Sequence, residues 1–252
     1  MRFLLLILLS VIFSSCASKK EVLYFQDAKE KGALTVSYKS PTIQPNDILD
    51  IKIETLVPEV AIPYNKGANS QIQTASIDLL MLNGYLVSTE NTINFPVLGE
   101  ISVKGITTKA LESKIKKLLE EGKHLINPGV YIRILNAKVT ILGEVNAPGT
   151  YNFTEQNINI LQALGYANDL TINGVRDDVM IIREVDGIRT ISHLDLTSAE
   201  LLNNPYYTIQ PNDIIYVNQN NPKVKTAGFV GNVGTVLTIA SLALSVTILL
   251  TR

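Results

Sequence analysis

The chain has 252 residues, with 22 basic and 23 acidic side chains, two histidines and one cysteine, and a formal net charge of −1 at pH 7. Because it has neither a basic excess nor a basic run, the sequence does not indicate a nucleic-acid partner. A single cysteine excludes an internal disulfide, and with two histidines it forms no recognisable metal-ligand pattern. The length suffices for two small domains and a tail.

The first 15 residues are typical of a bacterial secretory signal peptide. Arg2 provides the positive end, and Phe3–Phe13 is apolar apart from Ser10 but too short to span a bilayer. Small residues then precede Cys16, as in a lipobox. We expect cleavage before Cys16 and a diacylglycerol on its sulfur; the alternative is an ordinary signal peptide followed by a chance cysteine. Residues 16–41 are Lys-rich and weakly patterned, which predicts a tether, with a strand at Val22–Phe25 as an alternative.

A nine-residue segment occurs twice in the chain. Ile43–Ile51 reads IQPNDILDI and returns 166 residues later as IQPNDIIYV at Ile209–Val217. A Pro-Asn-Asp turn followed by apolar and β-branched residues predicts a turn that enters a strand. Asn46 and Asn212 stand where a left-handed conformation is expected, which asparagine tolerates. Asp47 and Asp213 are expected to bond to the backbone of their turns rather than to act as paired carboxylates.

The remaining pattern predicts an α+β fold built from two small mixed modules, at residues 42–135 and 137–218. In the first module we expect strands at Ile48–Glu54, Leu86–Val87, Ile93–Phe95, Ile101–Val103 and Val130–Leu135, with a helix that begins at Thr107 or Thr108 and stops at Gly122. In the second we expect strands at Val139–Leu142 and Thr150–Phe153, a helix at Asn159–Leu164 closed by Gly165, a hairpin of Asp178–Val185 and Ile188–His193, and the second repeat as the last strand. Asp186-Gly187 predicts a type I′ turn in that hairpin.

The C-terminal segment is apolar enough to suggest a transmembrane helix. No residue between Lys225 and Arg252 is charged, and Phe229–Leu250 is 22 residues long, about 33 Å as a helix. A stripe of small and hydroxyl residues runs along it: Gly231, Gly234, Thr235, Thr238, Ser241 and Ser245. Such a stripe either lets helices pack closely and hydrogen-bond or faces water inside a ring of helices.

The search for chemistry finds no pattern typical of an enzyme. His124 and His193 lie in no metal-site spacing and in no recognisable catalytic triad, and we expect both to be structural. Gly143 and Gly149 are not part of a phosphate-binding Gly-x-x-x-x-Gly-Lys loop. We therefore expect no enzyme activity, no cofactor and no metal.

Two segments of the chain resemble known domains. Residues 95–101 (FPVLGEI), followed by VKGIT at 103–107 and a capped helix, resemble the polysaccharide export domain. Residues 139–151 (VTILGEVNAPGTY) resemble the opening of the soluble-ligand-binding β-grasp (SLBB) domain. Behind a lipobox, the two together resemble the outer-membrane polysaccharide export lipoproteins. Asn46 and Asn212 replace the family's glycine in the repeated turn, and Ala163-Leu164-Gly165 replaces its paired glycine.

The resemblance implies a homo-oligomeric ring whose modules stack as periplasmic tiers and whose C-terminal helices form a barrel through the outer membrane. Capsular or extracellular polysaccharide would pass without covalent chemistry. An inner-membrane chain-length-regulating copolymerase would be the partner, and with a single SLBB module the periplasmic body would be short. The competing interpretation is a periplasmic glycan-binding or scaffold lipoprotein whose C-terminal helix is only an anchor.

Overall fold

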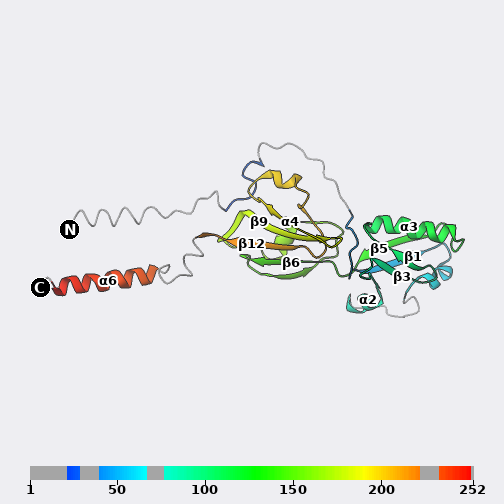
Figure 1. Cartoon of the computed structure of the whole chain (residues 1–252), viewed down its shortest axis with the longest axis horizontal. Coiled ribbons are helices and arrows are strands. Elements are labelled where there is room, and N and C mark those ends of the chain that lie inside the picture. Colours follow the sequence, from blue (N-terminus) through cyan, green and yellow to red (C-terminus); the bar gives the residue numbers. More distant parts are fainter. Residues whose placement is uncertain (1–21, 29–39, 67–76, 222–232, 251–252) are drawn as a thin grey trace.

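The computed structural model describes residues 22–28, 40–66, 77–221 and 233–250. Two lobes follow each other along the long axis of the molecule, and the helix α6 (Val233–Leu250) lies beyond the second lobe (Figure 1). Mixed strands and helices confirm the predicted α+β class. The signal peptide, Cys16 and residues 229–232 lie outside the described residues.

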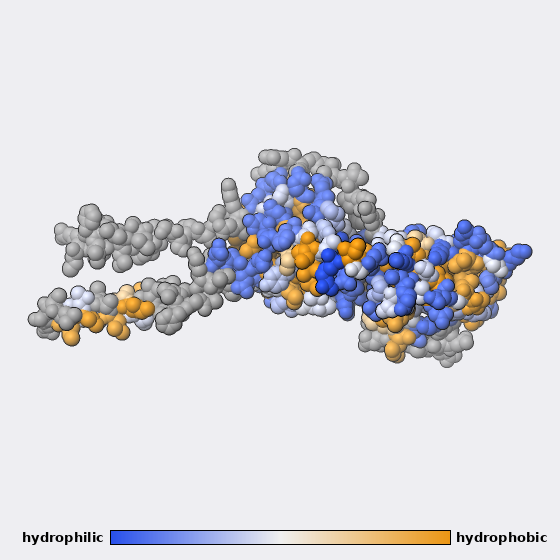
Figure 2. Space-filling view, in the orientation of Figure 1, coloured by the Kyte–Doolittle hydropathy of each residue, from blue (hydrophilic) through white to orange (hydrophobic). Residues whose placement is uncertain are grey.

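The first module is built around a three-stranded antiparallel sheet. Its order is β2 (Tyr85–Leu86), β1 (Ile48–Glu54) and β5 (Gly129–Ile134), with β1 at the predicted bounds. The helix α3 (Thr108–Glu121) packs on β5, and Thr107 caps it by accepting the N–H of Ala110. The other elements are the 3-10 helix η3 (Pro58–Tyr64), the helix α2 (Ile77–Asn83), and the hairpin of β3 (Thr92–Phe95) and β4 (Gly99–Ser102). Figure 2 shows apolar surface around α2, where Leu79, Leu80 and Leu82 are exposed.

The helix α3 ends at the expected place but by a different conformation. Gly122 is right-handed, with a φ of −71°, and Lys123 takes the left-handed conformation with a φ of 56°. The N–H groups of Lys123 and His124 donate to the carbonyls of Glu120 and Leu119, which is the Schellman pattern. A Cβ at Gly122 would lie 2.5 Å from the His124 ring, so a larger residue there would force that side chain to move.

The second module contains a five-stranded sheet with the second repeat at its centre. Its order is β10 (Ile188–Leu194), β9 (Gly174–Val185), β12 (Ile214–Gln219), β6 (Lys138–Gly143) and β7 (Gly149–Asn152), and only the β12–β6 pair is parallel. The other elements are β8 (Ile158–Asn159), which pairs with β11 (Thr208–Ile209), the helix α4 (Ile160–Tyr166) and the 3-10 helix η4 (Ala199–Asn203).

Two local expectations in this module have different outcomes. Asp186 and Gly187 have φ values of 52° and 77°, which confirms the type I′ turn. The expected stop of α4 at Gly165 is wrong, because Gly165 lies inside the helix, which ends at Tyr166. The start of α4 is fixed by a capping box between Asn159 and Gln162.

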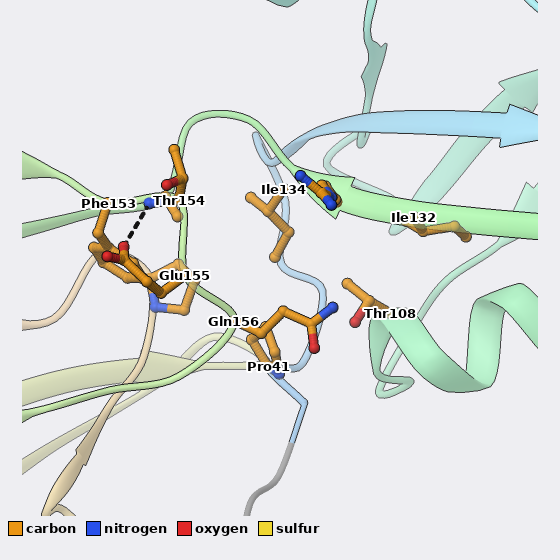
Figure 3. Close-up of a pocket in the computed structure, with 11 residues that line it drawn as sticks. Pro41, Thr108, Ile132, Ile134, Phe153, Thr154, Glu155 and Gln156 are labelled. Carbon is orange, nitrogen blue, oxygen red and sulfur yellow. Dashed lines mark hydrogen bonds between the residues drawn. The ribbon is translucent and has the colours of Figure 1, made fainter.

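The two modules have separate cores and meet at a short junction. Buried apolar side chains form one cluster from Ile43–Ile132 and another from Ala137–Val217, and Ile134 packs against both. A cavity of about 230 Å³ lies at the junction (Figure 3). Its lining comes from both modules: Pro41, Thr108, Ile132, Arg133, Ile134, Ala137, Phe153, Thr154, Glu155, Gln156 and Pro211.

The repeated turn has the same hydrogen bonds in both modules. Asn46 and Asn212 both have a φ of 69°, which confirms the left-handed conformation. Asp47 accepts the N–H of Gln44 at 2.8 Å, and Asp213 accepts the N–H of Gln210 at 2.7 Å. Each carboxylate is 1% exposed. Both aspartates therefore bond to the backbone of their turns, as the sequence predicted.

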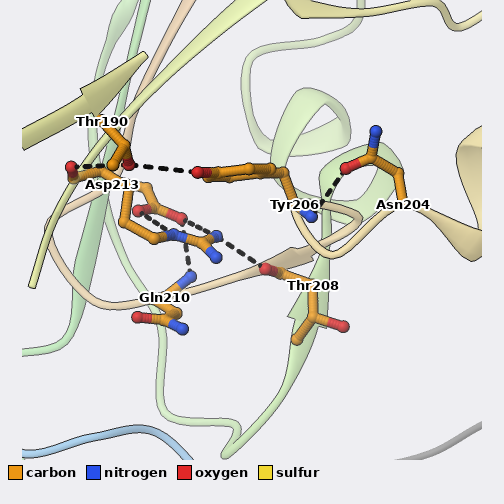
Figure 4. A network of polar contacts seen from close by, with 7 residues as sticks. Thr190, Asn204, Tyr206, Thr208, Gln210 and Asp213 are labelled. Carbon is orange, nitrogen blue, oxygen red and sulfur yellow. Dashed lines mark hydrogen bonds and ion pairs between the residues drawn. The ribbon is translucent and has the colours of Figure 1, made fainter. Parts of the chain in front are cut away.

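An arginine that sequence reasoning missed distinguishes the second turn. Arg183 on β9 binds Asp213 through two hydrogen bonds of 2.9 and 2.6 Å and also donates to the carbonyl of Thr208 (Figure 4). The Tyr206 ring stacks on the guanidinium of Arg183, with 4.9 Å between the guanidinium carbon and the ring centroid. The Tyr206 hydroxyl donates to the hydroxyl of Thr190. Burial raises the pKa of Asp213, and the Arg183 guanidinium opposes that rise.

The first turn has no such arginine in the described part of the chain. Burial raises the pKa of Asp47 to about 6, and the Gln44 N–H opposes the rise only in part. The amide oxygen of Gln44 accepts the N–H of Asp186, at the tip of the β9–β10 hairpin. The side chain of Asn136 bridges Ile48 and Asn46. Contacts to the second module and to the junction therefore hold this turn.

The left-handed turns predict a clear order of stability among substitutions. Asn46→Gly and Asn212→Gly should leave stability nearly unchanged, because glycine adopts positive φ without strain. Asn46→Val and Asn212→Val should each cost about 1–3 kcal/mol, measured by urea unfolding. Asn94→Val is the control, because Asn94 lies exposed in β3. Equal stability of the Gly and Val variants would contradict the role of these turns.

The raised pKa of Asp47 predicts a pH dependence of stability. Between pH about 4 and 6 the folded protein holds a proton that the unfolded chain has released, so stability falls as the pH rises through this window. The full loss is about 3 kcal/mol. Asp47→Asn should flatten the curve because asparagine still accepts the Gln44 N–H and does not ionise. Asp50→Asn, at an exposed site on β1, should keep the slope; an unchanged slope in Asp47→Asn would contradict the assignment.

Candidate functional site

The described part of the predicted tether lies against the second module. We call residues 22–28 the strap. The N–H of Phe25 donates to the carbonyl of Leu196 at 3.2 Å, and that of Gln26 donates to the carbonyl of Thr197 at 2.7 Å. These bonds do not make a strand, so the alternative expectation of a strand at Val22–Phe25 is wrong.

Side chains of the strap add specific contacts to the second module. The Tyr24 hydroxyl donates to the carboxylate of Asp169 at 2.5 Å, and burial together with this bond raises the pKa of Tyr24. Asp27 accepts hydrogen bonds from the Ser198 hydroxyl and the Ala199 N–H, and so caps η4. Tyr24 and Phe25 also pack against the second core. An aromatic pair in a Lys-rich segment was the sequence signal for this contact, and a tether alone does not account for it.

A cavity of about 530 Å³, which we call the end cavity, lies where the strap meets the end of β12. The strap contributes Gln26, and the chain after β12 contributes Asn220 and Asn221. The complete lining is Gln26, Ile172, Gly174, Val175, Arg176, Asp177, Thr197, Gln219, Asn220 and Asn221. Polar amides and charged groups therefore dominate this end of the module.

The strap and the end of β12 lead toward the two predicted membrane attachments. Val22 lies six positions after Cys16 in the chain, and an extended chain reaches at most about 3.6 Å per residue. The Cys16 backbone is therefore within about 22 Å of Val22. In the other direction, Asn221 is followed by residues 222–232 and then by α6. The chain segments that run toward Cys16 and toward α6 therefore both start beside the end cavity.

The predicted hydroxyl stripe falls on α6. The hydroxyls of Thr238, Ser241 and Ser245 each donate to a carbonyl of the same helix, at 3.1, 2.9 and 2.8 Å. At 100° per residue, Ile248 and Leu249 continue the same face toward the C-terminus, and both are exposed. The stripe thus covers the first three turns of α6, and apolar side chains follow it on the same face toward the C-terminus. Thr235 lies on α6 at the expected position.

Among the described residues, no helix is both long enough and apolar enough to cross a membrane. The expected spanning segment starts at Phe229, and α6 starts at Val233.

The described residues bring no metal-binding cluster together. No group of three or more His, Cys, Asp or Glu side chains is placed to hold a metal ion in this part of the chain. His193 contacts the carboxylate of Asp178 on the neighbouring strand, and both side chains are exposed. His124 packs edge-on against Tyr64, with ring centroids 6.0 Å apart.

Comparison with known proteins gives matches in the first module. The model of the family described as polysaccharide biosynthesis/export protein matches residues 36–135, starting six residues before the expected module boundary. The EPS I polysaccharide export outer membrane protein EpsA of Ralstonia solanacearum is 28% identical over 92 residues, which are 35% of this chain and 24% of that protein. EpsA of Ralstonia nicotianae is 28% identical over 106 residues, which are 40% of this chain and 27% of that protein. The chain thus spans about a quarter of the length of these relatives.

The matched residues coincide with the first core, from the turn at Asn46 through β1, the β3–β4 hairpin, α3 and β5. They include the FPVLGEI segment on which the resemblance rested. The first module is therefore similar to the polysaccharide biosynthesis/export family.

Proposed function

We propose that this protein is an outer-membrane lipoprotein that oligomerises into a ring-shaped channel for capsular or extracellular polysaccharide. The observation that carries the proposal is the export domain in residues 36–135. The names of the two Ralstonia relatives, which are outer-membrane export proteins, support the same localisation. Most of the chain would lie in the periplasm, anchored by the Cys16 lipid.

The proposal includes an orientation of the modules. The strap binds the second module and begins six positions after Cys16. In our proposal the second module therefore lies next to the membrane, and the export domain points into the periplasm. We assign the second module to the SLBB class on the VTILGEVNAPGTY segment, which forms β6, the following turn and β7. The export domain would then be the part that reaches an inner-membrane copolymerase.

The C-terminal segment would complete the channel. The helix α6 has 18 residues, about 27 Å, and a hydrocarbon core is about 30 Å thick. Spanning therefore needs Phe229–Asn232 as well as α6. Hydroxyls that bond to carbonyls of their own helix lower the cost of an apolar environment. In a ring of helices, the stripe would face either the lumen or the seams between neighbours.

Transport needs no catalytic chemistry in this proposal. The polymer passes through the ring, and synthesis at the inner membrane drives it. The protein acts without a cofactor or a metal, and its partners are its own copies, the polysaccharide and the copolymerase.

One observation favours the competing scaffold function. The stripe does not run the whole length of α6, and Leu237, Ile239, Leu242 and Leu249 are all exposed around the helix. An isolated lipid-facing anchor has such a surface. In that case the second module would hold glycan or a partner protein, and the helix would only attach it.

Truncation after Lys225 separates the two functions. The truncated protein should still fold and remain attached through Cys16, and export of polysaccharide should be lost if the helix is part of a channel. Normal secretion by cells that contain only the truncated protein would contradict the channel and favour the scaffold. Surface polysaccharide and the mass of the detergent-extracted assembly are the measurements.

Single cysteines along α6 test which face is wet. Thr238→Cys and Ser241→Cys should react with a water-soluble thiol reagent in a channel with an aqueous lumen, and Val236→Cys and Ala243→Cys should not. Lipidated Cys16 does not compete for the reagent. Loss of export on truncation with four inert positions would place the stripe in dry helix seams. Equal reaction at all four would contradict a one-sided stripe.

Lipidation is tested at Cys16 itself. Cys16→Ser should leave uncleaved precursor and abolish labelling by a clickable fatty acid, because the substituted hydroxyl does not accept the diacylglycerol. Ser15→Ala, which keeps a small residue before the cysteine, should label normally. Unchanged labelling of Cys16→Ser would contradict the lipid anchor.

A further inference from the structure

A buried arginine without a carboxylate partner lies in the wall of the end cavity. Arg176 on β9 is 5% exposed. Its two terminal nitrogens donate to the carbonyls of Gly174 and Thr171, and its Nε is buried without a hydrogen-bond partner. In the described part of the chain no carboxylate forms an ion pair with it, whereas Arg183 on the same strand is paired with Asp213.

Burial of an arginine without a carboxylate partner lowers the stability of the folded state. A buried charge is normally paired, because removing it from water costs several kcal/mol that neutral carbonyls repay only in part. A negatively charged group in the end cavity would supply the missing partner, and a carboxylate matches the planar guanidinium. The cavity, at about 530 Å³, is within the roughly 300–1,000 Å³ typical of small-molecule sites.

The rest of the lining narrows the chemistry of the ligand. Gln26, Gln219, Asn220 and Asn221 carry amides, which both donate and accept hydrogen bonds and so suit a ligand rich in hydroxyl groups. Asp177 in the same wall opposes a ligand with two negative charges. One carboxylate and several hydroxyls on one small molecule describe an acidic sugar.

We propose that the end cavity binds a sugar unit that bears a carboxylate, such as a uronic acid of an acidic polysaccharide. Arg176 takes the carboxylate, and the amides of Gln26 and Gln219 take hydroxyls. The polymeric source of this sugar rests on the proposed function; the site itself rests on the cavity and the unpaired arginine.

The position of the site gives binding a structural consequence. One part of its lining belongs to the strap, which leads to Cys16, and another belongs to the end of β12, which leads to α6. A sugar bound by both parts would connect the strap to the end of β12. Bound ligand should therefore also stabilise the attachment of the strap to the second module.

Calorimetric titration of the full-length protein in detergent tests the site. The probes are glucuronate, glucose and inorganic phosphate. Glucuronate should bind at least about tenfold more tightly than glucose and than phosphate. Arg176→Gln should remove that preference. Gln26→Ala, on the exposed strap, should weaken glucuronate severalfold in a protein that melts like the parent.

Arg189→Gln is the matched control, because Arg189 is exposed on β10 and pairs with Glu184 at the surface. This variant should bind like the parent. Equal binding of glucose and glucuronate, tighter binding of phosphate, or no binding by the folded protein would each overturn the proposal. None of these results depends on export. Loss of export in a deletion strain with no binding of glucuronate would refute the site and leave the channel standing, whereas normal export with binding intact would refute the channel alone.

Discussion

A buried carboxylate that accepts a backbone N–H three residues earlier starts the key strand of each module. Asp47 leads into β1, the centre of the first sheet, and Asp213 leads into β12, the centre of the second. The left-handed asparagine before each aspartate turns the chain so that the carboxylate points back at the turn. Because every other strand of these sheets adds outward from β1 or β12, the position of both cores depends on these turns.

The two copies of the turn offset the free-energy cost of burying the aspartate carboxylate in different ways. In the second module a bidentate arginine compensates Asp213, and Tyr206 covers the pair. In the first module no described arginine pairs with Asp47, and Gln44 and Asn136 tie the turn to the hairpin tip and the junction. The turn of the first module is therefore hydrogen-bonded to the second module and to the junction.

The second module is the part of the described structure to which the strap and the strand that precedes α6 both belong or bind. The strap is bonded to it through main-chain and side-chain contacts, and β12 leads out of its centre toward α6. In the membrane-anchored protein that we propose, the contacts of the strap would hold the module at a more constant distance from the membrane than a free tether would. For a ring of identical subunits, equal height above the membrane is a condition for regular side-by-side packing.

The sequence by itself determined the local features. The alternation of Ile48–Glu54 predicted β1, the repeat predicted two turns with positive φ, and Asp186-Gly187 predicted the hairpin turn, because each depends on neighbours a few residues apart. Tertiary structure alone decided the rest. The parallel pairing of β12 with β6, the Arg183–Asp213 pair and the strap join residues 30 to 172 positions apart. Lys123, not Gly122, is left-handed, and a Cβ at Gly122 would lie 2.5 Å from the His124 ring, a contact made by tertiary packing. Arg176 carries no local pattern, and only the folded chain shows that it is buried with an Nε that has no hydrogen-bond partner.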